Sequence, residues 1–383
     1  MFVDPKALEA AKNKNQGINA ADVGSKDSKT KTTEQPARKL YGRKWKIEIF
    51  KPAYKKEKQK DGKTKSIRDP EHDTSIDVSL LRCIFSIKHK VDTFLTQCSL
   101  VVYNLNAVTE GSVLTEGFQI RIEGGYVEGQ YGELFTGDIV QCFRNRENGI
   151  DYRLEIVALN GIFELPSNFT RGYIGEGSQP RTQINAIANN SKHEIKVGEV
   201  SPDLKKEPLP RGKVYFGTPA KYLRQIAIKN DAHFWIQPDG KLTMKKVTDE
   251  IPEDQCLVLT PTTGLIGTPV YSDNGIQISM LLDPRVKAMT LIKIDNQIIR
   301  RMAANLDQMN AMAAGPNLLD KGKTPNSLPQ SWQFDIDGEY QVYSLTHSGD
   351  TWGDTWKTDV VAVSRLGRRG LLAQMQNKGN TSR

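Results

Sequence analysis

The chain has few of the residues from which metal sites, disulfide frameworks and membrane spans are built. Its 383 residues include four cysteines, without a CxxC pair or zinc-ligand spacing, and five scattered histidines without an HExxH motif. No stretch approaches the ~18 consecutive apolar residues of a membrane-spanning helix. The first residues are not followed by the apolar segment of a signal peptide. We therefore expect no metal, no cofactor, no disulfide and no membrane span, in a protein made in a reducing cytoplasm.

Patterns of catalytic residues are also missing. The chain has no GxSxG motif and no cysteine in a nucleophile context, and no pair of its 45 acidic residues stands in a glycosidase frame. His347 lies three residues before Asp350, a spacing that suggests an acid–base pair. A histidine held in place by a neighbouring carboxylate is the commoner arrangement, and we favour it here. We do not expect an enzyme.

The net charge of +8 is unevenly distributed. Residues 1–70 hold 19 Lys and Arg against 9 Asp and Glu, and residues 365–383 hold five Arg and Lys and no acidic residue. Residues 71–364 therefore carry a formal charge of −7. A protein that reads nucleic acid gathers Lys and Arg on one folded face, whereas this chain has its excess at the ends. The pattern argues against sequence-specific nucleic-acid binding.

Composition and periodicity divide the chain into five parts. We expect a basic arm over 1–43, extended or disordered, and a first β-domain over 44–161. An α+β insertion over 162–251 follows, then a second β-domain over 252–365 and a basic tail over 366–383. The second β-domain contains a helical and loop insertion at about 300–331, where methionines recur at helical spacing before a Pro-, Gly- and Asn-rich stretch.

The first β-domain is predicted from alternating apolar residues. Residues 45–50, 80–88, 98–105 and 118–122 read as strands, and 134–143 with 152–159 read as a hairpin closed around Asn148-Gly149. Such spacing without intervening helices indicates a β-sandwich or β-barrel. Residues 51–68 read as a basic surface loop. Its lysines are candidate contacts with an acidic partner surface: Lys55, Lys56, Lys58, Lys60, Lys63 and Lys65.

The α+β insertion contains the clearest helix start. Thr218 is a good N-cap and Pro219 suits the first turn, and apolar residues then recur on one face. Residues 182–188 form a second helix candidate, and Pro238-Asp239-Gly240 reads as a hairpin turn. The insertion is either a scaffold element or a module that binds glycans.

The second β-domain contains strands at 256–260, 276–282 and 289–299, and a closing hairpin at 340–345 and 358–363. This hairpin resembles the one that ends the first β-domain. Leu154-Glu155-Ile156-Val157-Ala158-Leu159 matches Thr358-Asp359-Val360-Val361-Ala362-Val363 in pattern. We interpret the two β-domains as copies of one module that flank the insertion.

Several short motifs resemble baseplate hub proteins of contractile-tailed bacteriophages, of the late control protein D type. In chain order they are Gly264-Leu265-Ile266-Gly267-Thr268-Pro269, Leu281-Leu282-Asp283-Pro284, Gly338-Glu339-Tyr340-Gln341-Val342, His347-Ser348-Gly349-Asp350-Thr351 and Trp356-Lys357-Thr358. The first half continues the likeness with Asp77-Val78-Ser79-Leu80-Leu81-Arg82, Tyr103-Asn104-Leu105, Glu116-Gly117, Gly125-Tyr126 and Phe135-Thr136-Gly137-Asp138-Ile139. The resemblance covers roughly 44–161 and 252–365.

The resemblance implies a structural virion protein at the tail baseplate. It implies a homotrimer in which each subunit supplies two tail-tube-like β-domains, so that three chains form a pseudo-sixfold ring. Such a ring joins the hexameric tail tube to the trimeric central spike, with tape measure and baseplate wedge proteins as further partners. DNA passes through it without specific binding.

Three other readings stay open at this point. The first is a tail-associated protein that hydrolyses peptidoglycan or binds glycans, with 162–251 as its substrate module. The second is a nucleic-acid-binding β-barrel protein. The third is the spike-hub protein of a type VI secretion system. A protein of that kind needs a C-terminal β-helix needle after its hub domains.

Overall fold

The structure is a computed structural model that describes residues 41–51, 53–58, 64–68, 73–113, 118–202, 204, 207–246, 249, 256–272, 275–294, 300–301 and 338–364. The predicted arm up to residue 40, most of the predicted insertion at 300–331, and the basic tail lie outside these residues. The described part is mainly β, as the sequence predicted.

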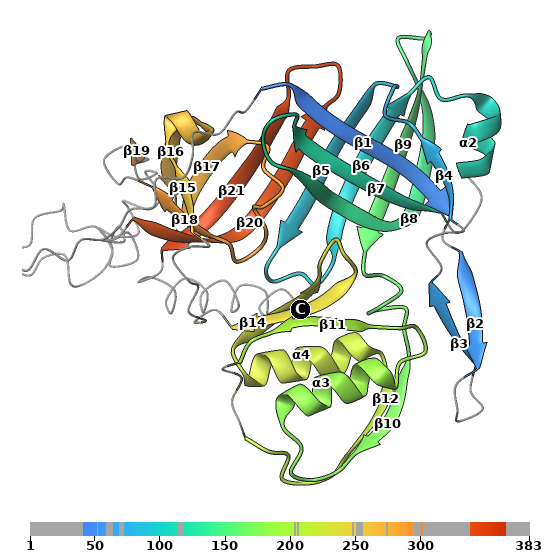
Figure 1. The fold of residues 1–383 in the computed structure, drawn as a ribbon, viewed down its shortest axis with the longest axis vertical. Coiled ribbons are helices and arrows are strands. Elements are labelled where there is room, and N and C mark those ends of the chain that lie inside the picture. Colours follow the sequence, from blue (N-terminus) through green and yellow to red (C-terminus); the bar gives the residue numbers. More distant parts are fainter. Residues whose placement is uncertain are drawn as a thin grey trace, which may run out of the picture. The chain divides into compact units, whose positions relative to one another are not determined.

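Most strands belong to one 14-stranded sheet (Figure 1). Its strands from the first half of the chain are β1 (Arg43–Lys51), β4 (Thr74–Asp77), β5 (Cys83–Lys90), β6 (Thr96–Tyr103), β7 (Gln119–Tyr126), β8 (Tyr131–Glu147) and β9 (Asp151–Asn160). Those from the second half are β15 (Leu257–Leu259), β16 (Leu265–Ser272), β17 (Gly275–Leu281), β18 (Leu291–Ile294), β19 (Arg300–Arg301), β20 (Glu339–Asp350) and β21 (Trp356–Ser364).

The two halves of the sheet share one topology. In the first half the neighbours run β5-β6-β9-β8-β7-β1, and in the second they run β16-β17-β21-β20-β18-β15. If these six strands of each half are numbered along the chain, with β4 and β19 left out, both orders read 2-3-6-5-4-1. One pairing differs, because β1 is antiparallel to β7 whereas β15 is parallel to β18. The internal repeat seen in the sequence is therefore present in strand order.

Each half has its own core. The first core gathers inward side chains of β1 and of β5 to β9, and the second gathers those of β15 to β18, β20 and β21. Burial alternates residue by residue along β5 and β6, as expected when one face of a sheet is packed and the other is not. Leu282 and Trp356 are exceptions, because they come from the second half and lie in the first core.

The residues between the halves form an α+β unit with a core of its own. Its elements are β10 (Thr170–Ile174), α3 (Pro180–Asn189), β11 (Lys196–Val200), β12 (Lys213–Gly217), α4 (Pro219–Lys229), β13 (Ala232–Ile236) and β14 (Lys241–Lys246). Helix α4 begins at Pro219 after Thr218, as predicted, and buries Tyr222, Leu223, Ile226 and Ala227 on one face. The two helices lie along the sheet β11-β14-β13 (Figure 1).

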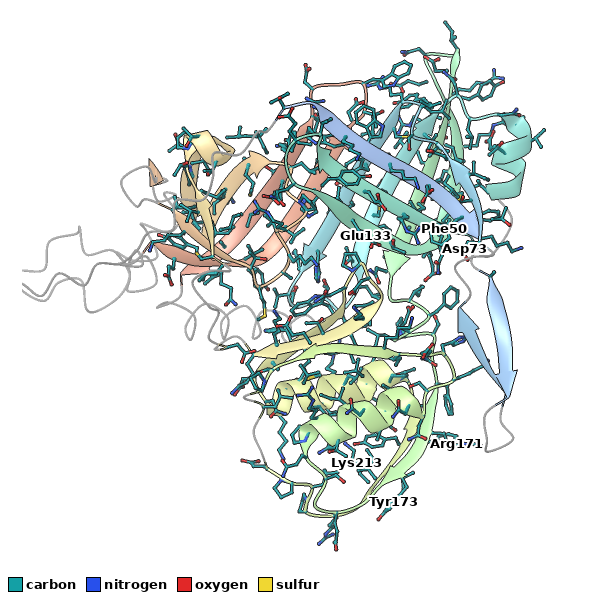
Figure 2. All side chains as sticks on the ribbon, in the orientation of Figure 1. Phe50, Asp73, Glu133, Arg171, Tyr173 and Lys213 are labelled. Carbon is teal, nitrogen blue, oxygen red and sulfur yellow. The ribbon has the colours of Figure 1, made fainter. Side chains whose placement is uncertain are left out.

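Strands β10 and β12 form a two-stranded sheet with no further strand in the described part of the chain, apart from an isolated bridge between Thr170 and Ser191. Their outward residues include Tyr173, Val214 and Phe216, all exposed, and Tyr173 projects away from the unit in Figure 2. Phe216 packs edge-on against Phe169 at a ring distance of 4.9 Å. The unit thus presents an apolar patch to solvent.

Several expectations from the sequence were wrong. The basic stretch after β1 is a β-hairpin, β2 (Tyr54–Lys58) with β3 (Thr64–Arg68), and the intervening Asp61-Gly62 is a turn signal that the lysine content obscured. Residues 107–113 form helix α2, and β10, β11, β12 and β16 are strands that were not predicted. Arg300–Arg301 pairs with β16 as a strand and does not begin a helix.

Candidate functional site

The two halves of the sheet are joined by strand β20, which serves both. Its first residues pair with β18 of its own half, through Glu339, Tyr340 and Gln341. Its last seven residues, 344–350, pair with β5 of the other half, from Ser344 opposite Lys90 to Asp350 opposite Ile84. A register shift between Val342 and Ser344 separates the two parts. We call the β5–β20 ladder and the residues packed on it the joint.

Asp350 and Thr351, two of the residues singled out by the resemblance, bond across the joint. The Arg82 guanidinium lies 2.9 Å from the Asp350 carboxylate. The Cys83 N–H donates to the Thr351 hydroxyl at 2.9 Å, and the Thr351 N–H donates to the Cys83 carbonyl at 3.0 Å. Partial burial raises the pKa of Asp350, but hydrogen bonds from Arg82 and from the backbone of the following turn outweigh this and lower it. The carboxylate therefore stays charged and paired.

Gly349 and Trp356 complete the joint by packing. The Trp356 ring meets Phe85 edge-on at 5.6 Å and Trp45 at 6.0 Å, so a residue of β21 fills the first core. A Cβ on Gly349 would lie 2.4 Å from Phe85 Cζ and 2.8 Å from Trp356, closer than real Cβ contacts. Only glycine fits where these two rings approach the backbone. Arg43 then donates to the carbonyls of Gly353 and Asp354.

The other resemblance motifs divide between the joint and the second core. Leu282 lies in the first core, and a Cβ on Gly132 would lie 3.4 Å from Pro284, so this motif also packs on the first half. Leu265 is in the second core. The remaining motif residues shape the start of β16: Gly264 at φ 108° after a 3₁₀ turn, Gly267 at φ 68°, and Pro269 within the register shift of β16 against β17.

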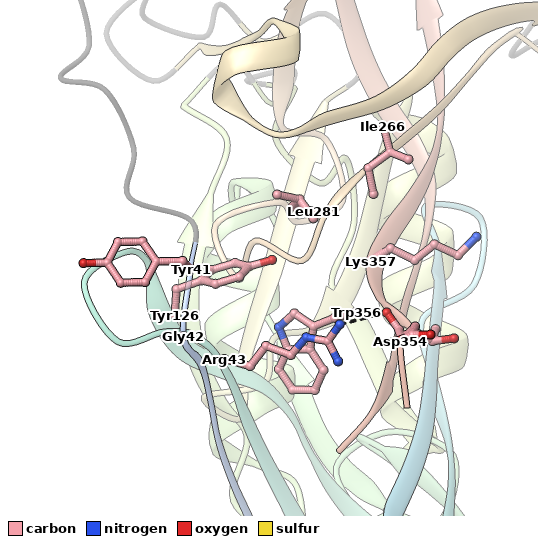
Figure 3. Close-up of a pocket in the computed structure, with 10 residues that line it drawn as sticks. Tyr41, Gly42, Arg43, Tyr126, Ile266, Leu281, Asp354, Trp356 and Lys357 are labelled. Carbon is pink, nitrogen blue, oxygen red and sulfur yellow. Dashed lines mark hydrogen bonds between the residues drawn. The ribbon is translucent and has the colours of Figure 1, made fainter. Parts of the chain in front are cut away.

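A groove of about 430 Å³ opens beside the joint (Figure 3). Arg43 lies over the Trp356 ring at 5.8 Å and holds the backbone of the β20–β21 turn on one side. The side chains that line the groove come from both halves of the sheet: Tyr41, Arg43, Tyr126, Ile266, Leu281 and Trp356. Asp354, Thr355 and Lys357 also line it, so the groove combines apolar side chains with charged and polar ones.

His347 is not paired with Asp350. Its Nδ1 lies 2.8 Å from the Thr358 hydroxyl, while Asp350 is engaged by Arg82. Burial lowers the pKa of His347 to about 4, and burial together with His347 lowers the pKa of His89, on β5, to about 4 as well. Both imidazoles are neutral packing groups near pH 7. The described residues contain no group of His, Cys, Asp and Glu arranged to hold a metal ion.

One face of the joined sheet is polar across both halves. Residues that oppose each other in successive ladders share a face. One such row runs through six strands from β17 to β9: Ser279, Asp359, Thr346, Lys88, Gln97 and Leu159. The next row on the opposite face is fully buried: Met280, Thr358, His347, Ile87, Cys98 and Ala158. The polar side chains of this row therefore continue across the joint, from Ser279 to Gln97.

The candidate lysine contacts are not brought to the joint. Lys55, Lys56 and Lys58 belong to β2 and Lys65 to β3, whose ladder contains only these two strands. Lys60 and Lys63 lie outside the described residues. The proposed contact of these lysines with an acidic partner stays a prediction. No helix in the described part of the chain has the length and apolar character needed to cross a membrane.

The sequence motifs named the residues that the second half contributes to the joint, but did not identify their partners in the first half. Arg82, Phe85 and Trp45 are as essential to it as Asp350 and Trp356, yet Arg82 and Asp350 are 268 residues apart. No local pattern links residues at such a separation. The weak signal was the arginine of the Asp77–Arg82 motif, which the resemblance quoted without a role.

Comparison with known proteins gives structural likenesses at low identity. No protein-family model matches the chain, and no curated protein matches it. Among solved structures, a 43 kDa tail protein of prophage MuSo2 from Shewanella oneidensis is similar with a TM-score of 0.48 and 9% identity, over 84% of this chain and 98% of that one. A tail protein from Neisseria meningitidis is similar with a TM-score of 0.43 and 14% identity, over 85% and 97% of the two chains.

A third likeness is to an Escherichia coli component of the type VI secretion system. Its TM-score is 0.41 and its identity 10%, over 74% of this chain and 73% of that one. These three solved structures are thus two tail proteins and a type VI secretion component. All three are distant from this chain, and they are given as likenesses alone.

Proposed function

We propose that the chain is a structural protein of a phage tail baseplate, the hub that joins the tail tube to the central spike. One observation carries the proposal: two β-units with the same strand order are fused into a single sheet by β20. The resemblance motifs support it, because Asp350, Thr351, Gly349, Trp356 and Leu282 all lie at this fusion. Their role is to hold two alike units at a fixed angle, without catalysis.

A fused pair of alike units allows one trimer to match both a sixfold and a threefold partner. Three copies of this chain present six alike β-units, which matches a sixfold ring, while everything that occurs once per chain repeats three times. The α+β unit and the β2–β3 hairpin are such single elements. The homotrimer therefore offers a pseudo-sixfold face to the tube and a threefold face to the spike. Tape measure and wedge proteins are further partners in the virion.

The polar face of the sheet suits the wall of a channel. Its rows are rich in Ser, Thr and Gln, and its charges are mixed: Lys357 pairs with Asp359 at 2.9 Å, and Lys88 lies two strands from Asp359, opposite Thr346. Clustered cations would hold DNA through its phosphates, and paired charges do not. The formal charge of −7 over residues 71–364 also argues against a wall with an excess of cations. We propose that it lines the path of the DNA.

Light scattering on the full chain tests the proposal. At micromolar concentration we expect a particle of about three times the chain mass of 42.9 kDa, or a multiple of it. The measured mass should stay the same at ~0.5 M salt, because salt weakens contacts between exposed charges and has little effect on apolar contacts and backbone hydrogen bonds. A stable monomer at this concentration would contradict a ring-forming hub.

A further inference from the structure

The second half of β8 is the counterpart of the part of β20 that makes the joint. Both strands carry a register shift at the same place, between Ile139 and Gln141 in β8 and between Val342 and Ser344 in β20. After the shift, Gln141 faces Val157 as Ser344 faces Val361. The seven residues 141–147 are thus equivalent to the seven residues 344–350, which pair with β5.

The two equivalent segments differ in what covers them. Residues 344–350 are paired on both edges, and each is buried or half-buried. Residues 141–147 pair with β9 on one edge, and no described strand pairs with the other. Most of them are exposed, and the apolar Val140 and Phe143 are 50% and 43% exposed. An unpaired strand edge with apolar side chains is a template for another strand.

The backbone groups of this edge point outward. Tyr152, which faces Arg146 in the ladder, uses its N–H and C=O toward Asn104: it donates to the Asn104 side chain at 3.0 Å and accepts from the Asn104 N–H at 2.8 Å. Tyr152 and Arg146 are therefore a non-hydrogen-bonded pair, so Arg146 directs its own N–H and C=O away from β9. By alternation, Arg144 and Cys142 do the same.

We infer that this edge, through residues 144–147 at the end of the exposed segment of β8, pairs with the start of strand β16 of a second copy of the chain. In the joint the equivalent segment pairs with β5, and β16 occupies the place of β5 in the second half. Leu265 faces Met280 as Cys83 faces Val102, so Ile266 is equivalent to Ile84. Ile266 is 40% exposed, and β19 meets β16 only at Val270 and Tyr271, which leaves the start of β16 open among the described residues.

The contact between copies thus repeats the contact within the chain. Each chain makes one β5–β20 joint internally and offers one β8 edge and one β16 edge to different neighbours. Such a head-to-tail contact generates a ring when the rotation closes, here after three chains and six joints. The inference rests on the proposed ring and names the strands that close it.

A proline at an outward backbone N–H tests the edge. Arg146→Pro removes a donor that the ladder to β9 does not use, so the isolated fold should keep its thermal midpoint. We expect Arg146→Pro to shift light-scattering mass from trimer to monomer, with at least a tenfold rise in the dissociation constant. Arg146→Ala deletes the same side chain but keeps the N–H, and should remain trimeric. A trimeric Arg146→Pro protein would overturn the inference.

A disulfide across the contact tests the register. Asp350 faces Ile84 in the joint, so Glu147 of one copy should face Ile266 of the next. In a Cys142→Ser background, Glu147→Cys with Ile266→Cys should give covalent dimers and trimers under mild oxidation, and neither single variant should give trimers. Glu147→Cys with Lys241→Cys is the control, because it places the second thiol on β14 of the α+β unit instead of on β16, and it should give no covalent trimers.

The outcomes separate the two proposals. A trimer that neither crosslinks through 147 and 266 nor responds to Arg146→Pro overturns the edge pairing and leaves the hub intact. A wild-type monomer overturns both.

Discussion

Gly349 shows how little room the joint leaves at the scale of a single residue. The Phe85 and Trp356 rings approach its Cα so closely that any side chain must displace an aromatic ring. We expect Gly349→Ala to lower the free energy of unfolding by about 1–3 kcal/mol, the usual cost of overpacking a core. Denaturant titration measures it. Gly175→Ala, where a Cβ meets nothing within 4 Å, is the control, and equal effects of the two changes would contradict this account.

At this scale the sequence names residues but not their partners. Trp356 and Asp350 stood out through motif resemblance, and the small, aromatic and acidic character of their segment was visible from the letters alone. That Trp356 fills the core of the other half, against Phe85 and Trp45, depends on a chain path that no local rule encodes. The His347–Asp350 spacing misled for the same reason, since each residue is held by a partner distant in sequence.

At the scale of elements, β5 and β20 carry a pair of buried histidines, which makes the joint sensitive to acid. Burial lowers the pKa of His89 and of His347 from 6.5 to about 4 in the fold. Between pH 6.5 and 4 the unfolded chain binds protons that the folded chain does not, so stability falls as the pH falls. The loss is on the order of 3 kcal/mol per histidine at most.

Thermal denaturation at several pH values measures this effect. The midpoint should fall from pH 7 to pH 5 in the wild-type protein, and fall less steeply in a variant that carries His89→Gln and His347→Gln. The comparison of slopes removes the contribution of carboxylates, which both proteins share. Parallel slopes would show that the two histidines do not couple folding to pH.

Elements were predictable where the local pattern was strong. The β8–β9 and β20–β21 hairpins and the start of α4 at Pro219 follow from alternation and from helix-start residues. The β2–β3 hairpin was missed because its lysines resemble a solvated loop, and β16 because it contains Gly267 and Pro269, which are uncommon inside strands. In β16 these residues form an edge irregularity instead, which a single sequence does not distinguish from a turn.

At the scale of the whole molecule, the repeated strand order is the feature that the proposed hub requires, because three chains with two alike β-units each carry six of them. Sequence identity between the halves is too slight to show the repeat beyond one hairpin, whereas the ladders match it strand by strand, with Ala158 and Ala362 in equivalent positions. The shared feature is a pattern of inward and outward residues, which survives when the residues themselves change. The continuity of the sheet across the joint had no counterpart in the sequence.

The central claim is that three chains present six alike β-units around a ring. Electron microscopy of the purified full-length protein, with class averages viewed down the axis, tests it most directly. We expect an annulus with a central hole, six similar lobes around it and three further lobes from the α+β units. Particles without a hole, or rings whose lobes do not number six, would contradict the account.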